Sequence, residues 1–239
     1  LLVQIKDGED DLRFRAWIER NRKYVEDQTE GKVGYIYVPN TGVQGQNELF
    51  RQFYGQKDKL ALIIDERWNG GGQIPTRFIE LLHRPKVNYW ATRADRDWSW
   101  PPDAHGGPKC MLVNGLAGSG GDCFPYYFKQ RKLGKVIGTR TWGGLVGISG
   151  NPQLIDSGGI TAPTFAFYET DGTWGVEGHG VDPDVEILAD QSKMTDGGDP
   201  QLDAAIANML DEIRKNPYAP PKRPAYPDRR GMGIKEQDK

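Results

Sequence analysis

The chain has 239 residues, with 31 basic and 33 acidic side chains for a net charge of −2, and hydrophobic residues form 37% of it. The apolar share is sufficient for a buried core, while the nearly neutral charge argues against nucleic acid or an anionic membrane as an obligatory partner, since both favour a basic face. No apolar run approaches the ~20 residues that span a bilayer, and two cysteines, Cys110 and Cys123, are too few for a disulfide framework or a four-ligand zinc site.

Helical and extended patterns alternate through the first half of the chain. An apolar segment at residues 1–5 is typical of a strand end and indicates a piece of a longer polypeptide. Apolar residues at three- and four-residue steps predict a helix over residues 11–25. The other elements expected in this half are a strand at 32–38, a helix at 47–54, a continuous apolar strand at 60–65 and a helix at 75–82.

The second half continues the alternation and ends in a proline-rich tail. Asp199 and Pro200 begin an amphipathic helix whose apolar stripe runs from Leu202 to Ile213. The five prolines of residues 216–239 predict a polyproline-like strap or a disordered tail. Further strands are expected at 109–114, 135–138, 161–168 and 185–188, with a helix at 122–130. The whole pattern predicts an α/β fold.

Two glycine-rich loops each follow a predicted buried strand and lead into a predicted helix. The first reads DERWNGGG at residues 65–72, and the second reads NGLAGSGGD at residues 114–122. In the second loop Ser119 lies on a tight strand-to-helix turn, which can hold a hydroxyl exposed in a strained backbone conformation. The Gly120 N–H follows it, and glycines in both loops let N–H groups approach a ligand oxygen. One interpretation is therefore a nucleophile with an oxyanion hole, in which each donor is typically worth ~3 kcal/mol of barrier.

Other interpretations of the same residues stay open at this point. A Gly-Ser-Gly-Gly sequence is more often a flexible turn than a catalytic one, and Asp65 and Asp122 can be explained as caps of a strand end and a helix start. No Lys-Ser/Thr pair follows either loop, which excludes a phosphate-binding P-loop. Cys123 has no base or metal partner in the pattern, so it is not expected to be a nucleophile.

Four motifs in order resemble the C-terminal-processing peptidase superfamily. They are DxRxNGGG at 65–72, the loop at 114–122, GTRTWGG at 138–144 and VExxGVDPDV at 176–185. The last two look more like the tricorn protease branch, and the resemblance covers about residues 10–215. It implies a crotonase/ClpP-like α/β fold built as a ββα superhelix. It also implies a serine endopeptidase that cleaves peptides or unfolded polypeptides through an acyl-enzyme, as a cytoplasmic homo-oligomer without cofactor or metal.

The resemblance further implies the roles of individual residues. Ser119 matches the nucleophile, and the N–H groups of Gly120 and Gly72 match the oxyanion donors. Glu177 matches the carboxylate that orients the catalytic histidine through an intervening serine. The processing-peptidase branch has a lysine base about where Gly144 stands here, and glycine cannot accept a proton. The histidine-based variant is therefore favoured.

The histidine itself is the main departure from the tricorn pattern. In that branch it belongs to a Ser-His pair in an upstream domain, separated from this region by a PDZ-like module. We therefore expect residues 1–8 to end a missing PDZ-like module, residues 9–215 to form the catalytic domain, and upstream domains of the same polypeptide to supply the base. Without the base the nucleophile is poorly activated and the isolated chain is expected to be nearly inactive. None of the three histidines present follows a serine: His83, His105 and His179.

Two alternative functions are weighed beside this one. An α/β-hydrolase would pair Ser119 with His179, because AxSxG at 117–121 is a relaxed nucleophile elbow and Asp156 or Asp171 keeps that fold's chain order. A peptide-binding or assembly module with a degenerate site is the non-enzymatic alternative.

The tryptophan-rich stretch at residues 90–100 is expected to be a loop that could line a peptide cleft. In the tricorn branch an acid near this segment can select basic side chains. Tyr89 and Trp90 occupy the corresponding place here, so apolar or aromatic specificity is expected.

Overall fold

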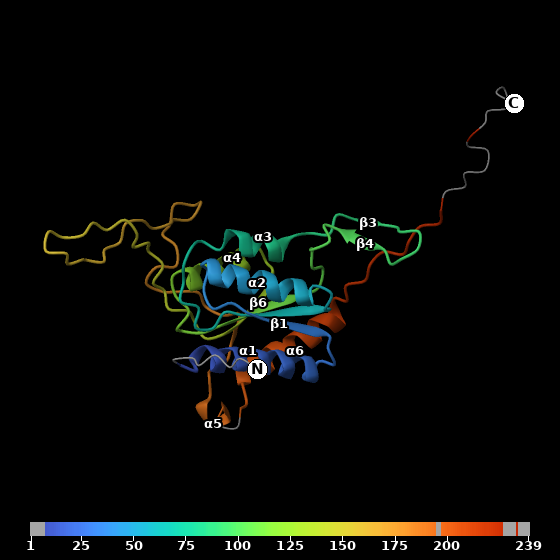
Figure 1. The fold of residues 1–239 in the computed structure, drawn as a ribbon, viewed down its shortest axis with the longest axis horizontal. Helices are drawn as coiled ribbons and strands as arrows, with labels where there is room; N and C mark the ends of the chain where they lie inside the picture. The colour runs from blue at the N-terminus through green and yellow to red at the C-terminus, as the bar shows by residue number, and fades with distance from the viewer. Residues whose placement is uncertain (1–7, 195–196, 227–232, 234–239) are drawn as a thin grey trace, which may run out of the picture.

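The computed structural model describes residues 8–194, 197–226 and 233. Its helices and strands, labelled in Figure 1, alternate as expected along most of the chain. The strand expected at residues 1–5 lies outside the described residues. In chain order the elements are α1 (Asp10–Gln28), β1 (Val33–Tyr37), α2 (Val43–Gln56), β2 (Ala61–Asp65), α3 (Thr76–His83), β3 (Asn88–Trp90), β4 (Trp98–Trp100), β5 (Lys109–Val113), α4 (Gly120–Gln130), β6 (Gly134–Gly138), β7 (Val185–Glu186), α5 (Gln191–Met194) and α6 (Pro200–Lys215).

Five strands form one sheet in which every neighbouring pair is parallel, in the order β1-β2-β5-β6-β7. The remaining strands, β3 and β4, pair only with each other as an antiparallel hairpin. Parallel strands joined through helices define the α/β class, and that prediction is confirmed. The ββα superhelix stays a prediction.

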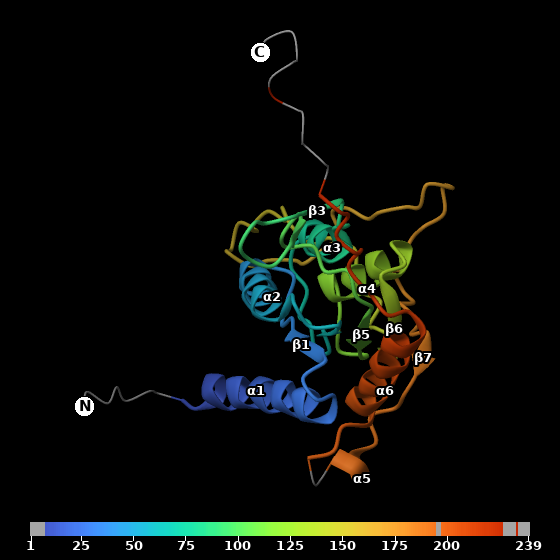
Figure 2. The same cartoon turned by 90° about the vertical axis from the view of Figure 1, so that its right-hand side faces the viewer.

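Helices cover both faces of the sheet, as Figures 1 and 2 show. Alternate residues of one strand therefore enter different cores: Leu62 and Ile64 pack with α2, α3 and α4, whereas Ile63 packs with α1 and α6. Every residue of β1, β2 and β5 is buried, and coverage of both faces explains why these strands do not alternate between apolar and polar residues.

Local hydrogen bonds fix where two of these helices begin. Asp199 accepts the Leu202 N–H at 3.0 Å, so α6 begins at Pro200 as its sequence predicted. At α2 the side-chain oxygen of Asn40 accepts the N–H groups of Gly42 and Gly45, each at 3.0 Å. These bonds satisfy early N–H donors, and α2 begins four residues before the expected position 47.

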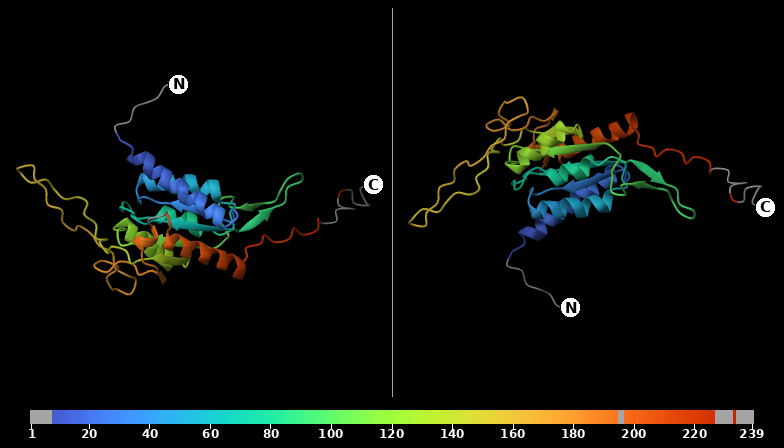
Figure 3. Two further views of the ribbon diagram at one scale, coloured as in Figure 1. Left: turned by 90° about the horizontal axis from the view of Figure 1, so that it is seen from below. Right: turned by 90° about the horizontal axis from the view of Figure 1, so that it is seen from above.

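The strand expected at residues 161–168 is wrong. Between β6 and β7, residues 139–184 contain no helix or strand. Their only pairing is three isolated bridges, Gly147 with Phe165, Gln153 with Gly159 and Tyr168 with Trp174. The side chains of Phe165 and Tyr168 are exposed, so the alternating pattern there covers no core. Figure 3 shows this excursion extending away from the sheet, at the end of the molecule opposite the β3–β4 hairpin.

The loop expected at residues 90–100 is instead the β3–β4 hairpin, in which the rings of Trp90 and Trp98 stack with centroids 5.4 Å apart. The described part of the proline-rich tail runs beside it without forming a helix or strand. Tyr218 contacts Tyr89, and the Arg223 guanidinium pairs with Asp97. Within the described residues, no helix has the length and apolar content needed to cross a membrane.

Candidate active site

The carboxyl ends of the parallel strands bring four loops to one edge of the sheet, the edge where α/β folds commonly bind ligands. The loops are 38–42 after β1, 66–75 after β2, 114–119 after β5 and 139–144 after β6. Backbone hydrogen bonds join them: Gly118 N–H donates to the Asn69 carbonyl at 3.1 Å, and Trp142 N–H to the Ala117 carbonyl at 2.9 Å. The two glycine loops singled out in the sequence therefore lie side by side.

Ser119 is the residue immediately before α4, and its backbone conformation is rare for a residue with a side chain. Its φ is 57° and its ψ is −115°, and the residue is half-buried. Its neighbours must lack side chains, because a Cβ at Gly118 would lie 2.6 Å from the Trp142 ring and a Cβ at Gly120 would lie 1.9 Å from Thr41 Oγ1. Strained turns of this kind present a hydroxyl at the start of a helix.

Two backbone N–H groups beside Ser119 have no acceptor. Within the described residues, neither the Gly72 N–H nor the Gly120 N–H donates a hydrogen bond. The two N–H groups lie near each other, because a Cβ added to Gly120 would be 3.1 Å from the Gly72 nitrogen. A Cβ on Gly71 would lie 2.7 Å from Ser119 Cβ, so the hydroxyl-bearing residue adjoins the same spot.

The directions of these two N–H groups are set by the carbonyls of their own peptides. The Gly71 carbonyl accepts the Thr41 N–H at 2.9 Å, and the Ser119 carbonyl accepts the N–H groups of Asp122 and Cys123 at 2.9 and 3.0 Å. In a trans peptide the N–H points opposite to the C=O. These bonds hold both donor peptides in place, and Gly72 and Gly120 line one cavity together with Ser119.

Two buried polar side chains tie the loops together. Asn69 Oδ1 accepts the Gly71 N–H at 2.9 Å, while the Asn69 carbonyl accepts Gly118 N–H. Asp122 is completely buried and accepts the Ser119 and Gly143 N–H groups at 2.7 Å each. The cap predicted for Asp122 is present, and the same carboxylate also joins the Ser119 turn to the 139–144 loop.

Glu66 lies beneath the same loops and is completely buried. Burial raises its pKa well above the ordinary value of 4.5, the negative charges of Asp122 and Asp65 raise it further, and the Asn69 amide opposes the shift. Glu66 therefore holds its proton more tightly than an exposed glutamate does, because a buried carboxylate charge is costly beside the other two carboxylates.

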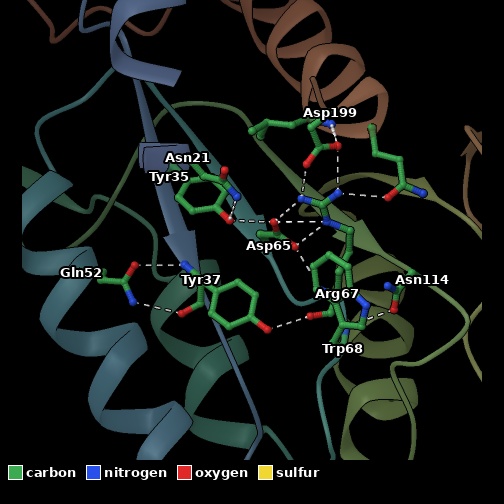
Figure 4. Close-up of polar contacts among 11 residues, drawn as sticks. Asn21, Tyr35, Tyr37, Gln52, Asp65, Arg67, Trp68, Asn114 and Asp199 are labelled. Carbon is green, nitrogen blue, oxygen red and sulfur yellow. Dashed lines mark hydrogen bonds and ion pairs between the residues drawn. The ribbon is translucent and has the colours of Figure 1, made fainter. Parts of the chain in front are cut away.

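A buried ion-pair network anchors the first glycine loop to α6, as Figure 4 shows. Arg67 is 1% exposed and donates to Asp65, with its shortest bond at 2.7 Å, and to both oxygens of Asp199 at 2.9 and 2.8 Å. Burial opposes its charge, but the two carboxylates raise the pKa of Arg67 above its ordinary value, so it stays protonated. Asp65 also accepts the Tyr35 hydroxyl at 2.7 Å and the Arg67 backbone N–H at 3.1 Å, so it caps the strand end as expected and is in addition a buried ion-pair partner.

A cavity of about 530 Å³ opens at Ser119. Gly72, Ser119 and Gly120 form one part of its lining, and the base of the 139–184 excursion forms another. Among the described residues, no charged side chain lines it. The larger side chains around it are apolar or aromatic: Ile74, Cys123, Tyr127, Leu145, Val146, Ile148, Phe165 and Phe167.

Glu177 lies on the 139–184 excursion, and its side-chain hydrogen bonds go to that same segment and not to the Ser119 turn. Its Oε2 accepts the backbone N–H groups of Leu145 and Val146 at 2.5 and 2.8 Å. Because Leu145 and Val146 also line the cavity at Ser119, Glu177 braces one wall of that cavity. Its side chain is exposed on the remaining side.

No histidine contact to Ser119 occurs in the described part of the chain. His179 is exposed and contacts Asp182 Oδ2 at 2.7 Å and Arg140 at 3.3 Å. His105 is buried, its Nε2 bonds the Lys59 carbonyl at 2.9 Å, and burial with the nearby Lys109 charge lowers its pKa to about 4. Nothing here favours a Ser119–His179 pair. Burial likewise raises the pKa of the Cys123 thiol to about 12, which leaves it inert as a nucleophile.

Sequence reasoning missed Thr41, although a signal was present. The segment Pro39-Asn40-Thr41-Gly42 directly follows a predicted strand, and such residues form tight turns. Its strand lies at the edge of the sheet beside β2, so the turn reaches the first glycine loop. What the sequence could not give was the strand order that makes these segments neighbours.

The site is thus a serine at a strand-to-helix turn of a parallel α/β domain, with two backbone N–H groups beside it that have no acceptor within the described residues. The sequence profile of peptidase family S41 matches residues 32–187, and the chain belongs to that family.

Individual relatives and solved structures agree with the family. The chain is 41% identical over 225 residues to the tricorn protease of Thermoplasma acidophilum, covering 94% of this chain and 21% of that protein. It is 38% identical over 221 residues to tricorn protease homolog 1 of Streptomyces coelicolor, covering 92% of this chain and 21% of that protein. A crystal structure of the tricorn protease matches with a TM-score of 0.84 and 42% identity over 90% of this chain and 21% of the other. The chain thus spans about a fifth of the length of these relatives.

Proposed function

We propose that this chain carries the nucleophile and the oxyanion hole of a tricorn-like serine endopeptidase acting on peptides or unfolded polypeptides. The observation that carries the proposal is the pair of unpaired N–H groups, on Gly72 and Gly120, beside the Ser119 hydroxyl. The relatives named tricorn protease support the same activity.

The proposed reaction is acyl transfer. Ser119 Oγ attacks the peptide carbonyl carbon while its proton passes to a base, and the carbonyl oxygen becomes an oxyanion that accepts the Gly72 and Gly120 N–H groups. Collapse of this intermediate breaks the C–N bond, and the leaving amine takes the proton. Water then attacks the resulting ester by the same steps and releases the acid. Preorganised donors lower the barrier because they need no reorientation when charge develops.

The base in this proposal is a histidine of a Ser-His pair in upstream domains of the same polypeptide. Glu177 orients that histidine through the intervening serine, and its exposed side leaves room for such a partner. The length of the relatives, about five times the matched region, supports a catalytic site assembled from distant parts of one chain.

The test compares the full-length polypeptide with the isolated 239-residue chain on fluorogenic peptides. We expect hydrolysis by the full-length protein, its loss in Ser119→Ala, and at least a thousandfold slower reaction by the isolated chain, since removing the base from such a site costs nearly as much as removing the whole site. Equal rates for the two proteins would contradict an upstream base. Peptide binding without hydrolysis by the full-length protein would favour a degenerate binding module.

Apolar or aromatic specificity is part of the proposal. In the described part of the chain no charged residue lines the 530 Å³ cavity at Ser119, and Tyr127, Ile74 and Phe167 suit an apolar side chain. A peptide panel should be cleaved fastest after an apolar or aromatic residue, and a preference for lysine or arginine would contradict this.

Homo-oligomer formation is the last part of the proposal. The 139–184 excursion extends beyond the domain and exposes large apolar side chains, among them Ile155, Ile160 and Trp174. Exposed apolar side chains gathered on one segment are typical of contact surfaces. Sedimentation of the full-length protein should give an oligomer, and a monomer at micromolar concentration would contradict it.

A further inference from the structure

The oxyanion hole proposed above has a third loop behind it, the turn that follows β1. Thr41 in this turn is 4% exposed, and within the described residues its hydroxyl oxygen is buried without a hydrogen-bond partner. Leaving a buried hydroxyl unpaired typically costs about 1–3 kcal/mol. Such a cost is more easily explained at a functional site than in an ordinary turn.

Thr41 contacts both proposed donor peptides. Its backbone N–H holds the Gly71 carbonyl at 2.9 Å and so directs the Gly72 N–H. Gly120 has no side chain. If it had one, its Cβ would lie 1.9 Å from Thr41 Oγ1 and 3.1 Å from the Gly72 nitrogen. The Thr41 hydroxyl oxygen therefore takes up the space that a side chain on Gly120 would need, and the Gly72 nitrogen adjoins the same space.

We propose that Thr41 is a positioning residue for the oxyanion hole, and that Gly120 and Thr41 work as a matched pair: the missing side chain of one admits the hydroxyl oxygen of the other, which sets the spacing of the two N–H donors. Thr41 Oγ1 is closed off from the cavity, so its action on the substrate is through Gly72 and Gly120. The inference rests on the proposed function for its catalytic consequence, while the geometric pairing can be tested without activity.

Size explains why the group at this place is an oxygen. A methyl group is larger than a hydroxyl oxygen, so Thr41→Val forces its γ-carbon against the Gly120 backbone and displaces one donor by a few tenths of an ångström. Thr41→Ser keeps the oxygen and removes only a methyl group. Small misplacements in catalytic geometry reduce turnover strongly, because the donors must meet the oxyanion and not the ground-state carbonyl.

The kinetic test uses the full-length protein. Thr41→Val should lower kcat about tenfold with KM nearly unchanged, and Thr41→Ser should recover most of that loss. As a matched control, Thr29→Val removes another buried threonine hydroxyl, one that bonds the Val25 carbonyl at 2.7 Å far from the site. The control should lower stability and leave kcat unchanged. Equal kcat for wild type and Thr41→Val would overturn the proposal.

The pairing itself is tested by a double-mutant cycle. Gly120→Ala places a Cβ against Thr41 Oγ1 and should reduce kcat, whereas adding Thr41→Ala removes the clashing atom and should restore about tenfold of that loss. Additive effects of the two substitutions would contradict the pairing.

A readout without catalysis separates this inference from the proposed function. In the isolated chain, Thr41→Val should shift the amide nuclear magnetic resonance signals of Gly72 and Gly120, and Thr41→Ser should leave them close to wild type. If the full-length wild type is inactive but these shifts occur, the proposed function fails and the pairing stands. Unchanged signals in Thr41→Val would overturn the pairing whatever the activity.

Discussion

Replacing Arg67 with methionine tests whether the buried network in Figure 4 holds α6 against the first glycine loop. Methionine keeps much of the apolar stem but removes every side-chain hydrogen bond to Asp65, Asp199 and Gln201, leaving only the backbone N–H bond to Asp65. Asp65 is completely buried, so its carboxylate would lose its cationic partner in a low-dielectric site. Breaking a buried pair by removing one partner typically costs 3–5 kcal/mol, roughly a third or more of a domain's whole stability.

The assay is urea unfolding of the isolated chain, followed by tryptophan fluorescence. With a slope of about 3 kcal/mol per molar urea, the Arg67→Met midpoint should fall by about 1–1.7 M. Arg22→Met is the control, because its partner Glu19 forms an exposed pair worth at most about 1 kcal/mol. Adding Asp65→Asn to Arg67→Met should recover part of the loss by removing the unpaired charge. A midpoint for Arg67→Met no lower than that of Arg22→Met would refute this reasoning.

Three further outcomes are expected. Asp122→Asn leaves one acceptor oxygen for two N–H donors and should lower the free energy of unfolding by about 2 kcal/mol. A loss below about 0.5 kcal/mol in urea unfolding would show that the carboxylate is not needed. Glu66 has a raised pKa and binds its proton more tightly when folded, so wild-type stability should decline as pH rises above the ordinary value of 4.5. Glu66→Gln cannot ionise, and its stability relative to wild type should grow as pH rises above 4.5; parallel curves would contradict the assignment. Burial raises the pKa of the Cys123 and Cys110 thiols, so iodoacetamide at about pH 8 should modify neither until the chain unfolds, and rapid labelling of the native protein would contradict their burial.

The elements predicted correctly from sequence are those whose pattern is enforced by the core. The apolar run of β2 fits a strand that is covered on both faces, and the apolar stripe on α6 fits a helix that packs against the sheet on one side. Each pattern therefore indicates one kind of element. The stretch at 161–168 shows the limit. Its residues have strand propensity, but within the described residues they make only isolated bridges, at Phe165 and Tyr168, and neighbouring strands decide whether propensity is realised. The tryptophan-rich stretch at residues 90–100 is the opposite case, since a loop was expected and a hairpin forms. Its two strands are close in sequence and pair with each other, and stacked aromatic rings stabilise the pairing.

The candidate site was predictable where it depends on backbone, and not where it depends on contacts between distant segments. Glycines after buried strands indicated the Ser119 turn and its donors, since only tight turns need them there. Thr41 escaped notice because its relation to Gly120 exists only once β1 and β5 lie on either side of β2. Asp122 was expected to cap a helix, but its second bond, to Gly143, depends on a loop that no local pattern describes.

The most direct test of the account is the site at which a fluorophosphonate reacts with the full-length protein, located by mass spectrometry of its peptides. The account predicts a single adduct on Ser119, absent from Ser119→Ala and strongly slowed in Gly72→Ala, where a Cβ would lie 2.6 Å from the Gly42 nitrogen and displace one donor. An adduct on another residue, or peptide hydrolysis that persists in Ser119→Ala, would contradict it.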